Sequence, residues 1–289
     1  MREQILAAIE SERGRRPEVR LNKSRAAHLA QEWACEPFNL PVWDAPVIMD
    51  SNLELASAYF FFGNAINFAF PPDQFGPVGS VQFWLTLRSH PELLESLLQI
   101  SPDRFLALFG PLPMWEARVA LWQETARLLR RKYNGKVTDL YEANHWNAPE
   151  IVQAMMRDFP AFRDVAAGIP FARRAQLTLF MTHCRFQESM LFTNLDYLTA
   201  SADLQVFNGL LQLGVLEVPE IPASQGLIAA ESDLEVTLRS AAILGADTLL
   251  HEINLRRKEK VTACQLDYIL RETGTKCKVP FSLALTTAY

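Results

Sequence analysis

The stretch NLELASAYFFFGNAINFAF, residues 52–70, carries apolar side chains on nearly every side of a helix. A helix that is apolar all round is buried inside a protein or a membrane. Glu54 and two asparagines interrupt the run, which falls short of the roughly 20 clean residues that a bilayer needs. The stretch therefore predicts a helix in the core of a large helical protein, and we expect Pro71 and Pro72 to end it.

A second stretch, PMWEARVALWQETARLLRRKY at residues 113–133, has the periodicity of an amphipathic helix. Large apolar side chains recur at spacings of three and four from Trp115 to Tyr133, which is one face of a helix. Most of the arginines and the lysine lie off that face. We expect the apolar face to belong to the core.

Further helices are predicted from capping residues and periodicity. Ser24 is of the type that caps a helix, and Ser101 followed by Pro102 opens another. The remaining predicted helices cover residues 149–159, 173–191, 201–213, 232–253 and 261–273. Extended or alternating pieces are short, at residues 19–22, 215–218 and in the terminal VPFSLALTTAY, and we expect residues 219–226 to form a flexible loop.

These elements predict a mostly α fold with a few short strands. No internal repeat, low-complexity tract or linker rich in Gly, Ser or Pro divides the chain. We therefore expect residues 1–289 to form a single helical domain.

The composition narrows the class of protein. A chain of 289 residues that is 49% hydrophobic and has 12 glycines can bury a large core and is not disordered. Its 28 basic and 33 acidic side chains leave a net charge of -5, whereas non-specific binding to a phosphate backbone needs clustered lysine and arginine. We expect no direct binding to nucleic acid, whereas the net charge does not exclude the binding of small charged ligands.

The four cysteines form no CxxC pair and no spacing typical of a metal site. We therefore expect a reducing, cytoplasmic setting and no metal. The first twenty residues carry scattered charges and do not resemble a secretory signal. No membrane contact and no obligate protein partner are predicted.

Common catalytic and cofactor motifs are absent from the sequence. The glycines lie too far apart for GxGxxG or GxxxxGK[ST], and GxSxG does not occur, so we expect no cofactor. His183 and Cys184 are adjacent, but neighbours on a helix point about 100° apart and are poorly placed to share a proton.

Two carboxylates in apolar surroundings remain as candidates. Asp196 and Asp203 bracket the segment YLTASA, and a helix is predicted to begin close to Asp203. Asp203 can be a structural cap, because a carboxylate near a helix N-terminus stabilises the helix by about 0.3–1 kcal/mol. The functional alternative is that the two acids bind a sugar and a cation and stabilise positive charge at a reacting carbon.

A series of sequence landmarks runs along most of the chain: VRLNKSRAAHLA, then Trp43 with Asp44, NAINFAF (64–70), ISPDRFLALFG, the segment 113–121 with Arg118, FPAFRD, FARRAQL (171–177), LDYLTASADL (195–204), LGVLE, LEVTLRSAAI, and a closing segment that ends in Tyr289. In the order of these landmarks the sequence resembles the queuosine salvage protein family over most of its length. Singly these are weak signals, and their common order makes the resemblance specific.

The resemblance implies an N-glycosidase that releases queuine from queuosine 5′-monophosphate, on a helical fold similar to helix-hairpin-helix DNA glycosylases. It implies that Asp203 is the key carboxylate and Asp196 a second acidic position. The substrate-binding residues that it implies, or that we add as candidates, are Asn64, Asn67, Phe68, Tyr197, Arg173, Arg174, Gln176, Glu235 and Arg239. The ligand is then a free nucleotide or nucleoside.

The sequence also departs from the family pattern. The family usually has Tyr-Arg after the key aspartate, where Leu204 and Gln205 stand, and Lys where Arg173 stands. Its C-terminal His-His-Arg-Thr-Arg-Thr is replaced by the residues 281–286, FSLALT. These differences leave the exact base and the phosphate requirement open.

Each candidate also has a structural interpretation. The two asparagines 64 and 67 can simply bridge buried groups, since a buried amide needs partners. Glu235 and Arg239 are spaced as a helix ion pair. Arg118 is expected to pair with a buried acid rather than to contact a ligand.

Three hypotheses therefore stand. The first is a cytoplasmic N-glycosidase with Asp203 as its charge-stabilising carboxylate. The second is a helical nucleoside-binding or scaffold protein that has lost turnover, because basic groups are missing from the C-terminal segment. The third, a lesion-specific DNA glycosylase, conflicts with the net charge of -5.

Overall fold

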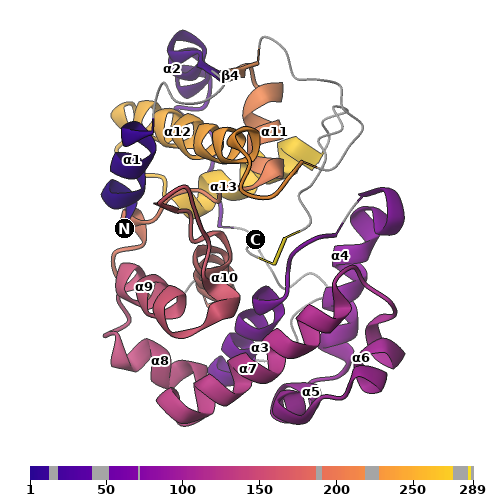
Figure 1. Ribbon diagram of the computed structural model, residues 1–289. Helices are drawn as coiled ribbons and strands as arrows, with labels where there is room; N and C mark the ends of the chain where they lie inside the picture. Colours follow the sequence, from indigo (N-terminus) through magenta and orange to yellow (C-terminus); the bar gives the residue numbers. More distant parts are fainter. Residues whose placement is uncertain are drawn as a thin grey trace. The chain divides into compact units, whose positions relative to one another are not determined.

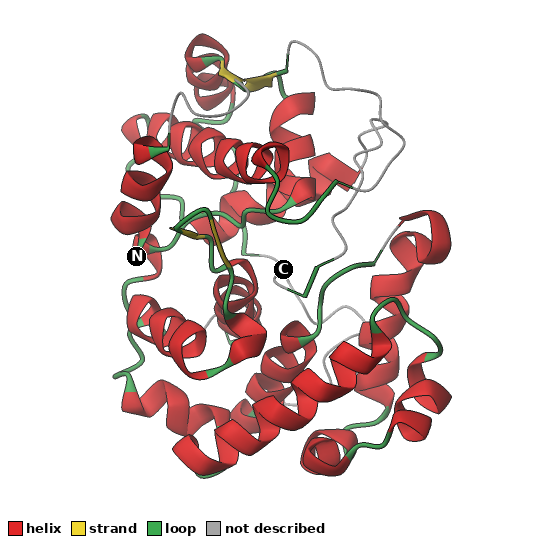
Figure 2. Ribbon diagram, viewed as in Figure 1, coloured by secondary structure: helices red, strands yellow, loops and turns green. Residues whose placement is uncertain are grey.

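The computed structural model describes residues 1–12, 19–40, 52–70, 72–186, 191–218, 228–275 and 286–287, with 72–79 as backbone only. Helices dominate these residues, and the strands are short (Figures 1 and 2). The mostly α fold class is confirmed. The likeness to helix-hairpin-helix DNA glycosylases stays a prediction.

The described residues contain thirteen α-helices, which follow in chain order. They are α1 (Arg2–Ser11), α2 (Lys23–Glu32), α3 (Leu53–Ala65), α4 (Pro72–Ser89), α5 (Leu93–Ser96), α6 (Pro102–Phe109), α7 (Trp115–Tyr133), α8 (Val137–Ala143), α9 (Ala148–Asp158), α10 (Arg173–Arg185), α11 (Leu204–Gln212), α12 (Asp233–Leu255) and α13 (Ala263–Thr275). Two antiparallel pairs join β1 (Arg20–Leu21) to β4 (Leu216–Glu217) and β2 (Val165–Ala166) to β3 (Ile169–Pro170).

The chain forms two compact units, each assembled from separate stretches. Unit 1 contains Met1–Pro41, Val165–Arg173 and Asn194–Leu285. Unit 2 contains Val42–Asp164, Arg174–Thr193 and Thr286–Tyr289. The single domain expected for residues 1–289 stays a prediction.

In unit 1, the core lies among α2, α11, α12 and α13, and α11 packs most extensively against α13. Two glycines permit this close approach. A Cβ at Gly274 would overlap the carbonyl oxygen of Gln205, and one at Gly209 would overlap the carbonyl oxygen of Leu270. Because neither glycine has a side chain, the backbones of α11 and α13 come into direct contact.

In unit 2, aromatic side chains fill the space around α3 and α7. Phe61 contacts Phe159 and Phe162 with ring centroids 5.1 and 4.9 Å apart, and Trp122 packs edge-on against Phe105. Trp122 also donates a 2.7 Å hydrogen bond to the carbonyl of Phe62. The predicted apolar face of the helix at 113–133 is therefore confirmed as core.

The helix expected over 52–70 is shorter than the sequence predicts. α3 begins after the Asn52 cap and ends at Ala65, and Pro72 begins α4 rather than ending a helix. Ala69 has a φ of 45°, in the left-handed region that a continuing helix cannot contain. The prediction followed the apolar pattern, whereas tertiary contacts to the carbonyls of 65–69 end the helix.

Other predicted boundaries have mixed outcomes. Asn22, not Ser24, caps α2, because the Asn22 side chain accepts from the backbone N–H of Arg25. Ser101 caps α6 as predicted. The helix predicted over 173–191 ends at Arg185.

Several predictions fall outside the described residues. They concern Trp43 and Asp44, the loop at 219–226, and the terminal segment 279–289 apart from Thr286 and Thr287.

The contact between α11 and α13 predicts that Gly274→Ala destabilises the protein by about 1–3 kcal/mol or more, because the new methyl group meets backbone atoms that cannot move independently. Gly245→Ala in α12 is the matched control. Its methyl group would lie 3.0 Å from Leu210 Cδ1, a side-chain atom that can shift. Urea denaturation of both variants measures the difference, and equal losses would contradict the close backbone contact.

Candidate functional site

Asp203 stands at the entrance of α11, at the end of a buried segment without regular structure. Residues 198–203 are all buried, and Asp203 itself is 7% exposed. Its Oδ1 accepts a 2.7 Å hydrogen bond from the backbone N–H of Gln205, so the predicted capping role is confirmed. The same carboxylate makes further contacts that a cap does not require.

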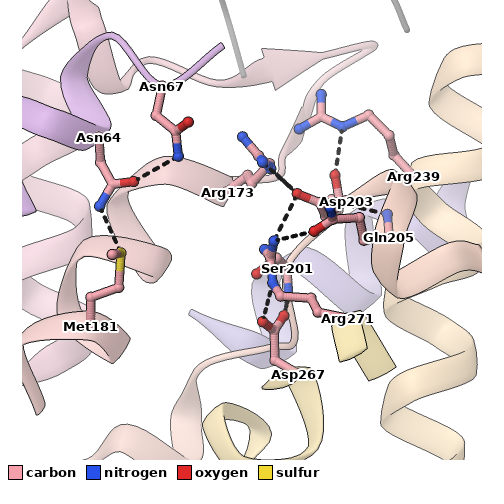
Figure 3. A network of polar contacts seen from close by, with 11 residues as sticks. Asn64, Asn67, Arg173, Met181, Ser201, Asp203, Gln205, Arg239, Asp267 and Arg271 are labelled. Carbon is pink, nitrogen blue, oxygen red and sulfur yellow. Dashed lines mark hydrogen bonds and ion pairs between the residues drawn. The ribbon is translucent and has the colours of Figure 1, made fainter. Parts of the chain in front are cut away.

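Two arginines from different elements converge on Oδ2 of Asp203 (Figure 3). Arg173, the first residue of α10, donates through Nε at 2.7 Å and pairs through Nη2 as well. Arg271 of α13 places Nη1 3.2 Å from the same oxygen. The carboxylate is thus held by charge on one oxygen and by a backbone N–H on the other.

A second buried carboxylate, Asp267, lies beside this pair in unit 1. Its Oδ2 accepts from Arg271 Nε at 2.6 Å, and its Oδ1 accepts from the backbone N–H of Ser201 at 2.6 Å. Asp267 is 3% exposed. Arg271 therefore bridges two carboxylates, and the four side chains Arg173, Arg271, Asp203 and Asp267 carry no net charge.

The pKa of the Asp203 carboxyl is set by two opposing effects. Burial raises the pKa, but the charges of Arg173 and Arg271 and the hydrogen bond from Gln205 outweigh burial and hold it well below its usual range. The pKa of Arg271 is correspondingly raised: burial lowers it, and the charges of Asp203 and Asp267 raise it by more. Asp203 is therefore ionised throughout the neutral range.

A further ion pair, on α12, contacts the segment 198–203. Glu235 and Arg239 form the ion pair that their spacing predicts, with 3.4 Å between Arg239 Nη1 and Glu235 Oε1, and both are buried. Arg239 lies over the ring of Phe171 at 4.0 Å and donates to the carbonyl of Ala202 at 3.4 Å. The pair thus contacts the backbone next to Asp203, and its part in substrate binding stays a prediction.

Asp196 and Tyr197 lie in the short 3₁₀ turn η4 (Leu195–Tyr197), which packs against α13. Both side chains are exposed, Tyr197 to 51%. Among the described residues, no hydrogen bond or ion pair engages the Asp196 carboxylate. Asp196 therefore differs from Asp203: it is accessible and not neutralised by a neighbour.

The other sequence candidates belong to unit 2. Asn64 is buried and links two neighbours, because its Oδ1 accepts from Asn67 at 3.2 Å and its Nδ2 lies 3.4 Å from the Met181 sulfur (Figure 3). Arg174 and Gln176 are fully buried in α10. These contacts confirm the bridging interpretation of the asparagines, and their role in binding stays a prediction.

Arg118 organises the segment that carries Asn67 and Phe68. Its guanidinium donates to the carbonyls of Ile66, Phe68 and Ala69, and it lies 4.3 Å from the Phe68 ring centroid. The expected pairing with a buried acid is wrong, because Arg118 donates its hydrogen bonds, among the described residues, to backbone carbonyl oxygens. Burial without a carboxylate lowers the pKa of Arg118 to about 9.

The sequence reasoning missed Asp267 and Arg271. A signal was present, since the two stand at i and i+4 in the predicted helix over 261–273, each directly after a core leucine. That spacing marks an ion pair but not its location. Only the approach of α13 to α11 brings Arg271 to Asp203.

The described residues, with the gaps given above, lack two other features. Within these ranges no three His, Cys, Asp or Glu side chains gather in a way that could hold a metal ion. None of the helices in the described part of the chain is long and apolar enough to cross a membrane.

Comparison with known families decides the relationship. A sequence profile described as queuosine salvage protein matches residues 56–280. The chain belongs to the queuosine salvage protein family. The resemblance drawn from the collinear landmarks is confirmed.

Curated members of the queuosine salvage family include three informative relatives, each named queuosine 5′-phosphate N-glycosylase/hydrolase. The one from Sphaerobacter thermophilus is 27% identical over 285 residues, covering 89% of this chain and 88% of that protein. The one from Schizosaccharomyces pombe is 27% identical over 227 residues, covering 75% of this chain and 63% of that protein. The one from Bos taurus is 25% identical over 232 residues, covering 74% and 65%.

The ion-pair network of this family member predicts that Asp203→Asn lowers the free energy of unfolding by about 3–5 kcal/mol at pH 7, because two largely buried arginines lose a carboxylate. The pKa of Asp203 is lower in the folded protein than in the unfolded chain. The ionised carboxylate therefore stabilises the fold fully above the unfolded-state pKa of about 4, and this contribution is lost as the pH falls below that value. The difference in the free energy of unfolding between wild type and Asp203→Asn should therefore be smaller by about 1 kcal/mol at pH 3 than at pH 7.

Asp196→Asn is the matched control for this experiment, because the exposed Asp196 should change stability by no more than about 0.5 kcal/mol. Urea denaturation between pH 3 and pH 7 measures both variants. A loss of unfolding free energy in Asp203→Asn that stays constant with pH, or that is no larger than the loss in Asp196→Asn, would refute the assignment of a buried ionised Asp203.

Proposed function

We propose that this protein hydrolyses the N-glycosidic bond of queuosine 5′-phosphate in the cytoplasm and releases queuine for salvage into tRNA modification. Membership of the queuosine salvage family and the names of its relatives support the reaction class. The observation that carries the proposal is Asp203, an ionised carboxylate held in a buried network at the N-terminus of α11. The free cysteines among the described residues agree with a reducing compartment.

The chemistry of the substrate explains the need for such a carboxylate. A 7-deazapurine has carbon at the ring position where guanine has its most easily protonated nitrogen, so activation of the base as leaving group is restricted. Positive charge therefore accumulates on the sugar as the bond from C1′ to the base nitrogen breaks. Water adds its oxygen to C1′, and the departing nitrogen takes up a proton, which gives queuine and ribose 5-phosphate.

Asp203 is suited to stabilise the charge on the sugar rather than to carry the proton. A carboxylate with a strongly lowered pKa is a weak base, but it remains an anion at every physiological pH. Fixed anions in a site poor in water stabilise a developing cation without having to reorganise. Asp203 thus acts as a preorganised electrostatic group that can also orient the attacking water.

Substrate recognition is assigned to accessible groups of unit 1. Tyr197 offers an exposed ring on which a base can stack, and the adjacent Asp196 offers a carboxylate for the secondary ammonium of the queuine side arm. The Arg173 side chain is 14% exposed and that of Arg271, the other arginine on Asp203, is 12% exposed. Arg173 is therefore assigned to the 5′-phosphate. The family resemblance and the sequence also propose these residues as substrate contacts: Asn64, Asn67, Phe68, Arg174, Gln176, Glu235 and Arg239.

The proposal predicts that purified protein converts queuosine 5′-phosphate to queuine and that Asp203→Asn lowers kcat by about 100-fold or more, as expected when a principal charge-stabilising group is lost. Asp196→Asn should raise KM more than it lowers kcat, because Asp196 is assigned to the side arm. Mass spectrometry of queuine and ribose 5-phosphate measures both variants.

Asp158→Asn is the matched control, because Asp158 in unit 2 is also a buried carboxylate, bonded to Lys132, Tyr133 and Arg157, but is not assigned to the site. Its activity should remain within about twofold once corrected for the folded fraction. If the nucleotide stabilises wild-type protein against heat but no product forms, the hypothesis of a non-catalytic binding protein replaces the enzyme hypothesis. Equal turnover by Asp203→Asn would remove Asp203 from the mechanism.

A further inference from the structure

We propose that Asp267, through Arg271 and the backbone of Ser201, is the positioning residue that fixes the Asp203 carboxylate for catalysis. The inference rests on the proposed function, and it concerns how this chain holds its reactive group. Asp267 makes no bond to Asp203 itself. It acts on Asp203 by two separate routes, one through charge and one through the backbone (Figure 3).

The charge route runs through Arg271. The Arg271 guanidinium uses Nε on Asp267 at 2.6 Å and Nη1 on Asp203 at 3.2 Å, while its buried Nη2 bonds none of the described residues. A planar guanidinium held at Nε has little freedom to rotate, so Asp267 determines where Nη1 points. Loss of the short bond to Asp267 would free Arg271 from its orientation towards Asp203.

The backbone route runs through the segment before α11. Asp267 accepts the N–H of Ser201, and the N–H of Asp203 in turn donates to the carbonyl of Ser201 at 2.8 Å. The segment 198–203 has no helical or strand pairing, so side chains satisfy part of its buried backbone: Asp267 accepts the Ser201 N–H, and Arg239 donates to the Ala202 carbonyl. Asp267 therefore anchors the backbone two residues before the carboxylate that it also orients.

The packing of unit 1 makes both routes rigid. Arg271 lies one helical turn before Gly274, whose contact with Gln205 presses α13 against the first turn of α11. Gln205 also contacts Arg271, with 3.4 Å from Arg271 Nη1 to Gln205 Oε1. A displacement of about 1 Å at a reacting group can cost about 100-fold in rate, so this precision has a functional consequence.

The first test is Asp267→Asn. An asparagine can still accept from the Ser201 N–H through its oxygen, but its amide would face Arg271 Nε donor to donor, so the variant mainly breaks the charge route. We expect kcat to fall by about 10- to 100-fold with KM within about threefold of wild type. Asp158→Asn is the control for the loss of a buried carboxylate, and it should leave kcat unchanged once corrected for the folded fraction.

The second test separates orientation from charge through Arg271. Arg271→Gln removes one of the two cations on Asp203, so the pKa of Asp203 should rise by about 1–3 units and the acid-side loss of kcat/KM should begin at correspondingly higher pH. Asp267→Asn keeps the Arg271 charge and removes a negative charge, so it should move the acid limb to higher pH by less than Arg271→Gln does. Arg271→Lys keeps the charge without the fixed fork, so it should retain the wild-type acid limb with reduced kcat.

A measurement without turnover keeps this inference distinct from the proposed function. Carboxyl ¹³C NMR titration reads the Asp203 pKa directly, with Asp203→Asn identifying the signal. Arg257→Gln is the control for the loss of an arginine in unit 1, because the Arg257 guanidinium donates, in the part of the chain that the structure describes, to the backbone carbonyls of 33, 34 and 36. An Asp203 pKa equal in Arg271→Gln and Arg257→Gln, or kcat equal in Asp267→Asn and Asp158→Asn, overturns the inference. Absence of queuine release by wild type refutes the function alone.

Discussion

The structure of unit 1 depends on the burial of two carboxylates next to each other. Asp203 and Asp267 are 7% and 3% exposed, and an isolated buried anion is too costly to remain ionised. Arg271 bridges both acids and Arg173 completes the balance, so the network is neutral while each member keeps its charge. Removing any one of these side chains would leave an uncompensated charge, and for that reason the network holds Arg173, the start of α11 and α13 together within unit 1.

This arrangement has a chemical consequence for a reaction that passes through a cation. An acid kept protonated by an apolar pocket can donate a proton, but it offers no anion to a sugar that becomes positive. Two arginines have the opposite effect, since they hold the pKa of Asp203 low, so that its carboxylate stays negatively charged across the physiological pH range. They also weaken the field that the sugar would feel. In the proposed mechanism the oxygen that faces the substrate is therefore Oδ1, which accepts from the Gln205 N–H and, among the described residues, from no arginine.

Sequence periodicity predicted most of the long helices because it reports local burial, although α1, α4, α5 and α8 were not predicted. The caps at Ser101 and Asp203 followed from side-chain chemistry. The end of the 52–70 helix was not predictable, because Arg118, fifty residues away, supplies the bonds that replace helical pairing. Asp203 was found from its position before a helix together with the family resemblance. Arg271 was not, because its contact depends on the absence of side chains at two glycines on facing helices.

The two units solve one physical problem in related ways. Each contains a largely buried stretch outside helices and strands, 66–69 in unit 2 and 198–203 in unit 1, and each stretch carries candidate site residues. Charged side chains from neighbouring helices satisfy these backbones: Arg118 binds carbonyls in unit 2, whereas Asp267 binds an N–H in unit 1. A helix or strand would fix its side chains at regular intervals. An irregular backbone held by charged side chains can place a carboxylate where the regular repeat would not, and it keeps that position only while the supporting charges stay in place.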